Sequence, residues 1–428
     1  MLPPFLSPVA LYERHLRRCL RRSGLSQRTV AVDGDTTLQF WGPGPGPGPD
    51  PAAARKPALV FLHGFGPKAI WQWRRQAQHF AAAFDVYVPD LVFFGGSATR
   101  SAERSETFQA AAVGKLLEKA GVERYAVVGT SYGGFVAYHM ARMWPERVER
   151  AVIASSGINR RRSDGEAMAK RAGAGAAAGG GGPADVMLPE TAASMRRLLG
   201  MAVSRRVSIM VPDFVLNDVI HRLYSENRKE KIELLTGLTT EKDDTPQVSA
   251  LQQDVLLVWG ENDRIFPVEM AHELKELLGK KVRLEVIKDT GHVPQLEDTA
   301  QFNKIVESFL RGPPRFRHKD IFKYFIFLSY SSCIIINRLN YCGKWVNFVR
   351  LVPFSCPTEL GARCRNLSLF HETLMMSFSM ASINLTKYPP RDVASCDVWN
   401  RMIRGRSNFS TWVYFSTDAR VEFRGEIF

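Results

Sequence analysis

Cysteine is almost absent from the first 310 residues, which contain only Cys19. The other five cysteines all follow Leu310: Cys333, Cys342, Cys356, Cys364 and Cys396. Their spacing matches no zinc site, and five is an odd number for a disulfide framework. A cysteine-poor body is typical of a reducing compartment, and Met1–Leu20 has no apolar run that fits a signal peptide. The sequence therefore predicts a cytoplasmic protein.

The sequence also has no features of a membrane-spanning, cofactor-dependent or nucleic-acid-binding protein. No segment contains the ~18 uninterrupted apolar residues of a transmembrane helix. The chain shows neither a glycine-rich phosphate loop nor a cluster of metal ligands, so we expect no cofactor and no metal. The net charge is +14, but the residues after Leu310 carry 17 Lys/Arg against 8 Asp/Glu. The body keeps only a small positive excess, and no nucleic-acid partner is expected.

A basic amphipathic segment stands near the N-terminus. Its less polar residues recur at helical spacing: Leu11, His15, Leu16 and Cys19. Five arginines are interspersed with them: Arg14, Arg17, Arg18, Arg21 and Arg22. Such a helix either packs on the edge of a domain or rests on a membrane surface as a peripheral contact. The sequence leaves both interpretations open.

Short apolar runs alternate with helical patterns through the body. Six runs predict strands: Ala58–Leu62, Asp85–Val88, Tyr125–Val128, Ala151–Ser155, Val255–Trp259 and Val282–Ile287. Five segments predict helices between and after them: Gln72–Ala83, Ser105–Ala120, Gly134–Met143, Pro267–Leu278 and Thr299–Leu310. Apolar strands separated by helices are buried on both faces of a mostly parallel sheet. The predicted fold class is α/β, with a doubly wound sheet.

One interval is too long for a simple connection. Residues 158–250 show only helical patterns, such as Thr191–Val203 and Asp218–Leu235, around an Ala/Gly-rich stretch at Ala172–Pro183. We expect this interval to form a helical lid over the carboxyl ends of the strands. The predicted organisation is an N-terminal helix and first strand in 1–40, a core in 41–157 and 251–311, the lid in 158–250, and a poorly ordered tail in 312–428 outside the catalytic domain.

The most specific motif is Gly-x-Ser-x-Gly at Gly129–Gly133. It follows the apolar run Tyr125–Val128 and precedes an apolar helix, which is the layout of a nucleophile elbow. The flanking glycines suit a turn too tight for side chains, and the turn presents Ser131 at the end of the sheet. The alternative is that Ser131 only caps a helix.

Two downstream residues supply the partners that a serine nucleophile needs. A base must take the hydroxyl proton, and a carboxylate must orient that base. His292 follows the strand Val282–Ile287, and Asp263 follows the strand Val255–Trp259. Asp289 competes with Asp263, but it is too close to His292 in sequence to come from a separate strand end. We predict a catalytic triad of Ser131, Asp263 and His292.

A developing oxyanion also requires preorganised donors. The motif His63–Gly66 follows the strand Ala58–Leu62, and its glycines allow close backbone approach. We assign the oxyanion hole to the backbone N–H groups of Phe65 and Tyr132. His63 is expected to order this loop rather than transfer protons.

Together these motifs resemble the α/β-hydrolase fold superfamily. The resemblance covers about Leu11–Leu310 and is carried by five segments: His63–Gly66, Pro89–Ser97, Gly129–Gly133, Trp259–Asp263 and Gly291–Pro294. Within the superfamily the chain resembles the serine esterase/lipase branch, especially plant proteins similar to monoacylglycerol lipases. The resemblance also implies that Asp90 is a structural aspartate. Relatives with an aspartate nucleophile are disfavoured because position 131 is serine.

The resulting prediction is a serine hydrolase of carboxylic esters, with a lipid-like small molecule such as a monoacylglycerol as substrate. Phe214 and Leu216 in the lid either line an acyl-chain pocket or only pack the lid on the core. The alternative function is a receptor for a small, hormone-like molecule on a hydrolase scaffold with little turnover. A fluorophosphonate probe that labels Ser131 without appreciable ester turnover would favour the receptor.

Overall fold

A computed structural model describes most of the chain up to Arg311 and four strands beyond it. The described residues of the body are 3, 5–44, 56–173, 183–204, 211–238 and 248–311. Contacts divide the chain into two compact units, Met1–Arg311 and Gly312–Phe428. The second unit contains a four-stranded antiparallel sheet, in the order β10 (Phe322–Ser329), β11 (Ser332–Tyr341), β12 (Lys344–Pro353) and β13 (Trp412–Ser416).

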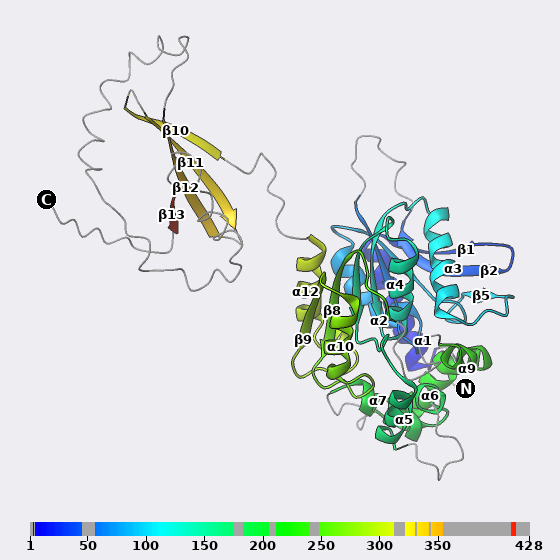
Figure 1. Cartoon of the computed structure of the whole chain (residues 1–428). Coiled ribbons are helices and arrows are strands. Elements are labelled where there is room, and N and C mark those ends of the chain that lie inside the picture. Colours follow the sequence, from blue (N-terminus) through cyan, green and yellow to red (C-terminus); the bar gives the residue numbers. More distant parts are fainter. Residues whose placement is uncertain are drawn as a thin grey trace. The chain divides into compact units, whose positions relative to one another are not determined.

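The first unit is built on a mixed sheet in the order β1-β2-β4-β3-β6-β7-β8-β9, with β5 paired to β2 (Figure 1). Its strands are β1 (Leu25–Ala31), β2 (Thr36–Pro43), β3 (Ala58–Leu62), β4 (Asp85–Pro89), β5 (Ala98–Thr99), β6 (Tyr125–Thr130), β7 (Val148–Ala154), β8 (Asp254–Gly260) and β9 (Val282–Ile287). Strands β3, β4, β6, β7, β8 and β9 run parallel, and the pairs of β2 are antiparallel. The parallel α/β sheet predicted from the apolar runs is confirmed.

Alternate residues of the central strands enter two hydrophobic clusters on opposite faces of the sheet. In β3, Val60 and Leu62 join one cluster, whereas Leu59 and Phe61 join the other. This is the side-chain period of a strand that is buried on both faces. Helices α3 (Glu106–Lys119), α4 (Tyr132–Met143) and α10 (Val268–Leu278) contribute to the first cluster. Helices α1 (Pro8–Arg22), α2 (Ala69–Phe80) and α12 (Thr299–Arg311) contribute to the second.

A helical insertion separates β7 from β8. It comprises α5 (Arg162–Arg171), α6 (Pro183–Met187), α7 (Ala192–Ala202), α8 (Asp213–Val219), the π-helical turn η3 (Ile220–Tyr224) and α9 (Arg228–Thr236). Figure 1 shows α5, α6, α7 and α9 gathered at one end of the first unit. The helical pattern predicted over Asp218–Leu235 is divided between the end of α8, η3 and α9, because Asn227 adopts a left-handed conformation with φ 52° and separates η3 from α9. Most of the Ala/Gly-rich stretch lies outside the described residues.

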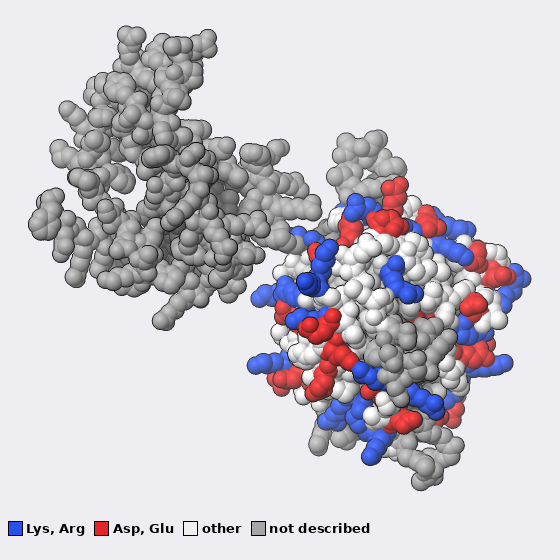
Figure 2. All heavy atoms as spheres, in the orientation of Figure 1, with Lys and Arg blue, Asp and Glu red and all other residues white. Residues whose placement is uncertain are grey.

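The N-terminal segment forms α1, but its buried face differs from the predicted stripe. Val9, Leu16 and Leu20 are buried, whereas Leu11 and His15 are exposed. The helix contacts α2 and α8, and this packing selects the buried residues. No helix within the described parts of the chain is long and apolar enough to cross a membrane. Figure 2 shows acidic and basic side chains interspersed on the visible face of the first unit.

Candidate active site

Ser131 stands in a strained turn between β6 and α4. Its backbone angles are φ 51° and ψ −121°, which a non-glycine residue rarely adopts. Two hydrogen bonds hold the turn: the Ser131 N–H donates to the Ala154 carbonyl, and the Gly134 N–H donates to the Ser131 carbonyl, both at 2.9 Å. The Ser131 side chain makes no capping hydrogen bond to α4. This is the backbone geometry of a nucleophile elbow and differs from that of a serine helix cap.

The glycines on either side of Ser131 are required by the backbone that crosses them. A Cβ at Gly129 would lie 2.1 Å from the Gly133 carbonyl oxygen. A Cβ at Gly133 would lie 2.2 Å from the Leu62 carbonyl oxygen. Backbone atoms cannot move away cheaply, so the helix reaches the sheet this closely only with glycine at both positions.

His292 and Asp263 form a buried pair beyond the ends of β9 and β8. The Nδ1 atom of His292 lies 2.9 Å from Oδ2 of Asp263. The other carboxylate oxygen, Oδ1, accepts the N–H groups of Ile265 and Phe266, each at 2.9 Å. These bonds fix the carboxylate, which in turn orients the imidazole. Asp289, the competing acid, is exposed and has φ 56°, and no hydrogen bond joins it to His292 within the described structure.

The second nitrogen of His292 is buried and available. With Nδ1–H directed at the carboxylate, Nε2 is the unprotonated, accepting atom of the neutral ring. No described residue forms a hydrogen bond with Nε2. The ring of Phe266 lies edge-on to the imidazole, with 5.5 Å between centroids. Because β6, β8 and β9 are parallel, Ser131 and this pair follow strand ends at the same edge of the sheet.

The loop after β3 lies directly against the elbow. A Cβ at Gly64 would be 2.9 Å from Cβ of Ser131. The N–H of Gly64 donates to the Gln72 side-chain oxygen at 2.7 Å, which anchors the loop to α2. The Phe65 ring meets the Tyr132 ring edge-on at 5.9 Å. Tyr132 is the first residue of α4, where a backbone N–H has no acceptor inside the helix, and the Phe65 N–H has no acceptor among the described residues.

His63 holds this loop through both ring nitrogens. Its Nε2 accepts the Leu91 N–H at 2.9 Å, so the proton is on Nδ1, which donates to the Gly64 carbonyl at 2.8 Å. Complete burial lowers the pKa of His63 to about 4, and the ring is therefore neutral at pH 7. These bonds join the loops that follow β3 and β4.

Asp90 ties the second of these loops to α2. Its Oδ1 accepts the Ala69 N–H at 2.8 Å. Burial raises the pKa of Asp90 to about 7, despite that hydrogen bond. Its location beside a helix N-terminus, with backbone partners, agrees with a structural aspartate.

The two lid residues assigned to the substrate pocket differ in exposure. Phe214 on α8 is 58 % exposed, whereas Leu216 is buried in the first hydrophobic cluster. Their roles in substrate binding stay predictions. Two other residues of the insertion lie near the loop after β3: Tyr224, whose hydroxyl is 3.2 Å from a Cβ built on Gly66, and Lys231, which lies over the Phe94 ring. Neither residue was predicted as part of a site, although the spacing of Lys231 from Leu234 and Leu235 places it on an apolar helix face.

A metal site is not found in the part of the chain that the structure describes, where no three His, Cys, Asp or Glu side chains cluster as metal ligands.

Comparison with known proteins identifies the family. The family model of the alpha/beta hydrolase fold matches residues 57–299, which include every residue of the candidate site described above. The chain belongs to the alpha/beta hydrolase fold family. The predicted superfamily and fold class are therefore confirmed.

Relatives within this family include several hydrolases. An uncharacterized protein of Mycobacterium tuberculosis is 26% identical over 290 residues, covering 66% of this chain and 84% of the relative. The 2-hydroxy-6-oxo-6-phenylhexa-2,4-dienoate hydrolase of Comamonas testosteroni is 24% identical over 274 residues, covering 60% and 89%. The crystal structure of a putative lipase from Acinetobacter baumannii aligns with a TM-score of 0.57 at 22% identity, covering 70% of this chain and 95% of that structure. All three proteins are bacterial, and the resemblance to plant enzymes stays a prediction.

Proposed function

We propose that this alpha/beta hydrolase is a serine hydrolase that cleaves carboxylic esters. The observation that carries the proposal is the buried Asp263–His292 pair, set at the same sheet edge as a serine in a strained elbow. In the proposed first step, Ser131 Oγ attacks the ester carbonyl while His292 Nε2 takes the hydroxyl proton. The imidazolium then gives this proton to the departing alcohol, leaving an acyl-enzyme.

Water completes the reaction in the proposed second step. His292 Nε2 takes a proton from the attacking water, the hydroxyl adds to the acyl carbonyl, and Ser131 leaves with the proton returned by His292. In both steps the N–H groups of Phe65 and Tyr132 stabilise the negative charge on the carbonyl oxygen. Asp263 fixes the tautomer of His292 and stabilises the imidazolium. None of these steps uses a metal or a cofactor.

The proposed substrate is a lipid-like ester such as a monoacylglycerol. The similarity to a putative lipase supports this class, as does the apolar character of the insertion, whose Leu216 and Leu223 are buried. The insertion is proposed to act as a lid that selects the ester.

A probe of Ser131 tests the proposal directly. A fluorophosphonate should label the full-length chain and not the Ser131→Ala variant. Hydrolysis of p-nitrophenyl butyrate should likewise disappear in Ser131→Ala. Labelling without turnover would favour the small-molecule receptor, and absence of labelling would refute a nucleophilic Ser131.

We also propose that the N-terminal region contacts a membrane surface from the cytoplasmic side. Its exposed large apolar side chains are Phe5, Leu6, Leu11 and Tyr12, and Phe214 of α8 is exposed as well, with exposed fractions between 45% and 70%. The Ser7 hydroxyl donates to Asp218 at 2.5 Å, and Phe214 lies one turn before Asp218 on α8. The exposed face of α1 adds four arginines: Arg14, Arg18, Arg21 and Arg22. Apolar side chains beside a basic helix face suit an anionic lipid surface.

A further inference from the structure

Lys231 is a mostly buried cation that forms no ion pair with a described carboxylate. The residue is only 3 % exposed, although it belongs to the short helix α9 of the insertion. Its side chain has no hydrogen-bond acceptor and forms no ion pair with any described residue. A buried ammonium normally has a carboxylate or several oxygen acceptors around it, because removing the charge from water is costly.

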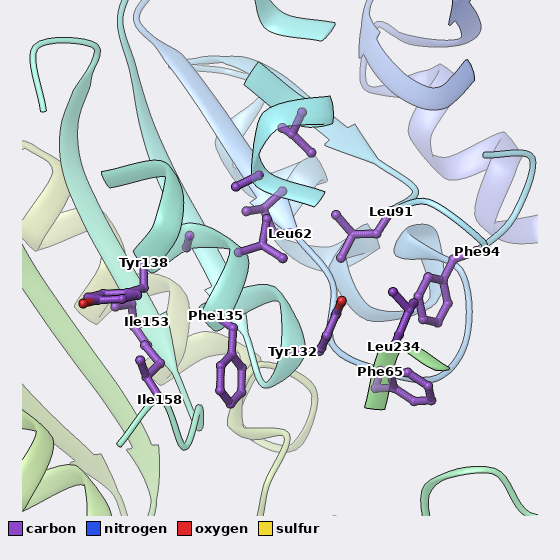
Figure 3. Packing of buried hydrophobic residues seen from close by; sticks show 14 of the residues in the cluster. Leu62, Phe65, Leu91, Phe94, Tyr132, Phe135, Tyr138, Ile153, Ile158 and Leu234 are labelled. Carbon is purple, nitrogen blue, oxygen red and sulfur yellow. The ribbon is translucent and has the colours of Figure 1, made fainter. Parts of the chain in front are cut away.

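The surroundings of Lys231 place it beside the proposed oxyanion loop. Its Nζ lies 5.1 Å from the centroid of the Phe94 ring. Phe94 in turn meets the rings of Phe65 and His63 edge-on, at 5.4 Å and 4.9 Å. Figure 3 shows Phe94, Phe65 and Leu234 among the buried residues of one hydrophobic cluster, and Leu234 is the next residue after Lys231 along the same face of α9. Phe94 thus contacts both Lys231 and Phe65, and the backbone N–H of Phe65 is assigned to the oxyanion hole.

Nearby charges do not neutralise this ammonium. Burial and the nearby Lys68 together lower the pKa of Lys231 to about 8, against the opposing effect of Glu226. Glu226 is exposed, and no ion pair between it and Lys231 occurs within the described structure. The cation–π contact with Phe94 offsets part of the desolvation, because the ring face attracts a positive charge. At pH 7 the side chain is still mainly protonated.

A second polar group from the insertion faces the same loop. The Tyr224 hydroxyl is 3.2 Å from a Cβ built on Gly66, and Tyr224 is buried. No described residue forms a hydrogen bond with this hydroxyl. The insertion therefore brings one hydroxyl to the loop that is proposed to bind the reacting carbonyl, and one cation to the Phe94 ring beside that loop. Neither group has a hydrogen-bond partner among the described residues.

We propose that Lys231 is a specificity residue that binds an anionic group, a carboxylate or a phosphate, on the substrate of this site. The inference rests on the proposed function and narrows its lipid-like esters to those that carry a negative charge away from the scissile bond, in place of a neutral monoacylglycerol. An anion would supply the partner that the ammonium lacks, and binding would keep Lys231 protonated. A neutral ester would leave the buried charge uncompensated, which is a basis for discrimination between the two kinds of substrate.

Two pairs of esters test this proposal with the full-length chain. The carboxylate pair is mono-p-nitrophenyl adipate and p-nitrophenyl hexanoate, which share a six-carbon acyl chain. The phosphate pair is 1-oleoylglycerol 3-phosphate and 1-oleoylglycerol. The measured quantity is the ratio of kcat/KM for the charged ester to that for the neutral ester. In Lys231→Met this ratio should fall roughly 10- to 100-fold in at least one pair, the range of a charge-assisted hydrogen bond.

Matched variants separate this role from a structural one. Lys231→Arg should keep most of the ratio, because it preserves the positive charge. Lys229→Met, an exposed lysine on the same helix, should match the wild type. A fall in the adipate pair alone identifies a carboxylate, and a fall in the glycerol phosphate pair alone identifies a phosphate. Ratios that are unchanged in both pairs for a folded Lys231→Met variant would overturn the proposal.

A binding measurement keeps the inference separate from the proposed function. Calorimetric titration of Ser131→Ala with mono-p-nitrophenyl adipate and with 1-oleoylglycerol 3-phosphate requires no turnover. If Ser131→Ala binds either compound and the double variant Ser131→Ala/Lys231→Met does not, the anion site is supported. This holds even if the wild type proved to be a receptor without esterase activity. Equal affinities with and without Lys231 would count against the anion site, even if ester hydrolysis were established.

Discussion

Asp263 uses its two carboxylate oxygens for different partners: Oδ2 faces His292 Nδ1 at 2.9 Å, and Oδ1 accepts two backbone N–H groups. An asparagine at this position would have to accept those same backbone groups with its oxygen. Its NH2 group would then face Nδ1 and favour the tautomer with the proton on Nε2, which cannot accept the proton of Ser131.

We therefore expect Asp263→Asn to lower kcat for p-nitrophenyl butyrate by about 10³–10⁴, with a small change in KM. Steady-state kinetics on purified protein measure this effect. Asp289→Asn is the control and should remain close to wild type, because Asp289 is exposed and has no bond to His292. A larger loss in Asp289→Asn than in Asp263→Asn would mean that the acid is wrongly assigned.

His63 should make the stability of the protein sensitive to acid. Its pKa is lowered from 6.5 to about 4 by burial. Between these values the unfolded chain binds a proton that the folded chain does not, so this contribution to stability is complete above pH 6.5 and is lost as the pH falls toward 4. Asp90 acts in the opposite sense, because its raised pKa reduces stability as the pH rises toward 7.

Urea unfolding of the wild type and His63→Asn between pH 4.5 and pH 8 measures the contribution of His63 alone, since Asp90 is present in both proteins. The difference between their free energies of unfolding should be largest near pH 7–8 and should shrink as the solution is acidified. His79→Asn, on an exposed side chain, provides the control. If the free energies of unfolding of the wild type and His63→Asn changed with pH by the same amount, His63 would not take up a proton on unfolding.

The exposed apolar side chains of the N-terminal region and Phe214 should determine membrane association. A variant with Phe5→Ser, Leu6→Ser and Phe214→Ser should sediment less with anionic phosphatidylglycerol vesicles than the wild type. Hydrolysis of a soluble p-nitrophenyl ester should be retained. Binding by the wild type should also weaken with added salt, because the arginines of α1 are exposed and screened. Equal sedimentation of both proteins would exclude these side chains as the contact.

The segment after Arg311 should be dispensable for catalysis. Contacts separate Met1–Arg311 from Gly312–Phe428, and the proposed catalytic residues all lie in the first unit. A chain that ends at Pro314 should therefore fold with a cooperative thermal transition and keep the kcat/KM of the full-length protein for p-nitrophenyl butyrate. Loss of folding or of activity would show that the second unit supports the first.

Most of the central sheet could be predicted because its strands are apolar on both faces. The run Val282–Ile287 coincides with β9, and Ala58–Leu62 coincides with β3. The insertion was harder to predict, since its helices pack on one another and on α1 through contacts distant in sequence. The bend at Asn227 and the exposure of Leu11 both depend on such packing.

The sequence by itself determined which groups are available for catalysis and in what order they follow the strands. Gly129 and Gly133 mark the elbow, and His292 and Asp263 each follow their own strand, because short motifs reflect local backbone requirements. Only the tertiary structure decided that Asp263, and not Asp289, bonds to His292. It also decided that Lys231 is buried over Phe94 without an acceptor. Hydrogen-bond partners and burial arise where separate elements meet, and a linear pattern does not specify that meeting.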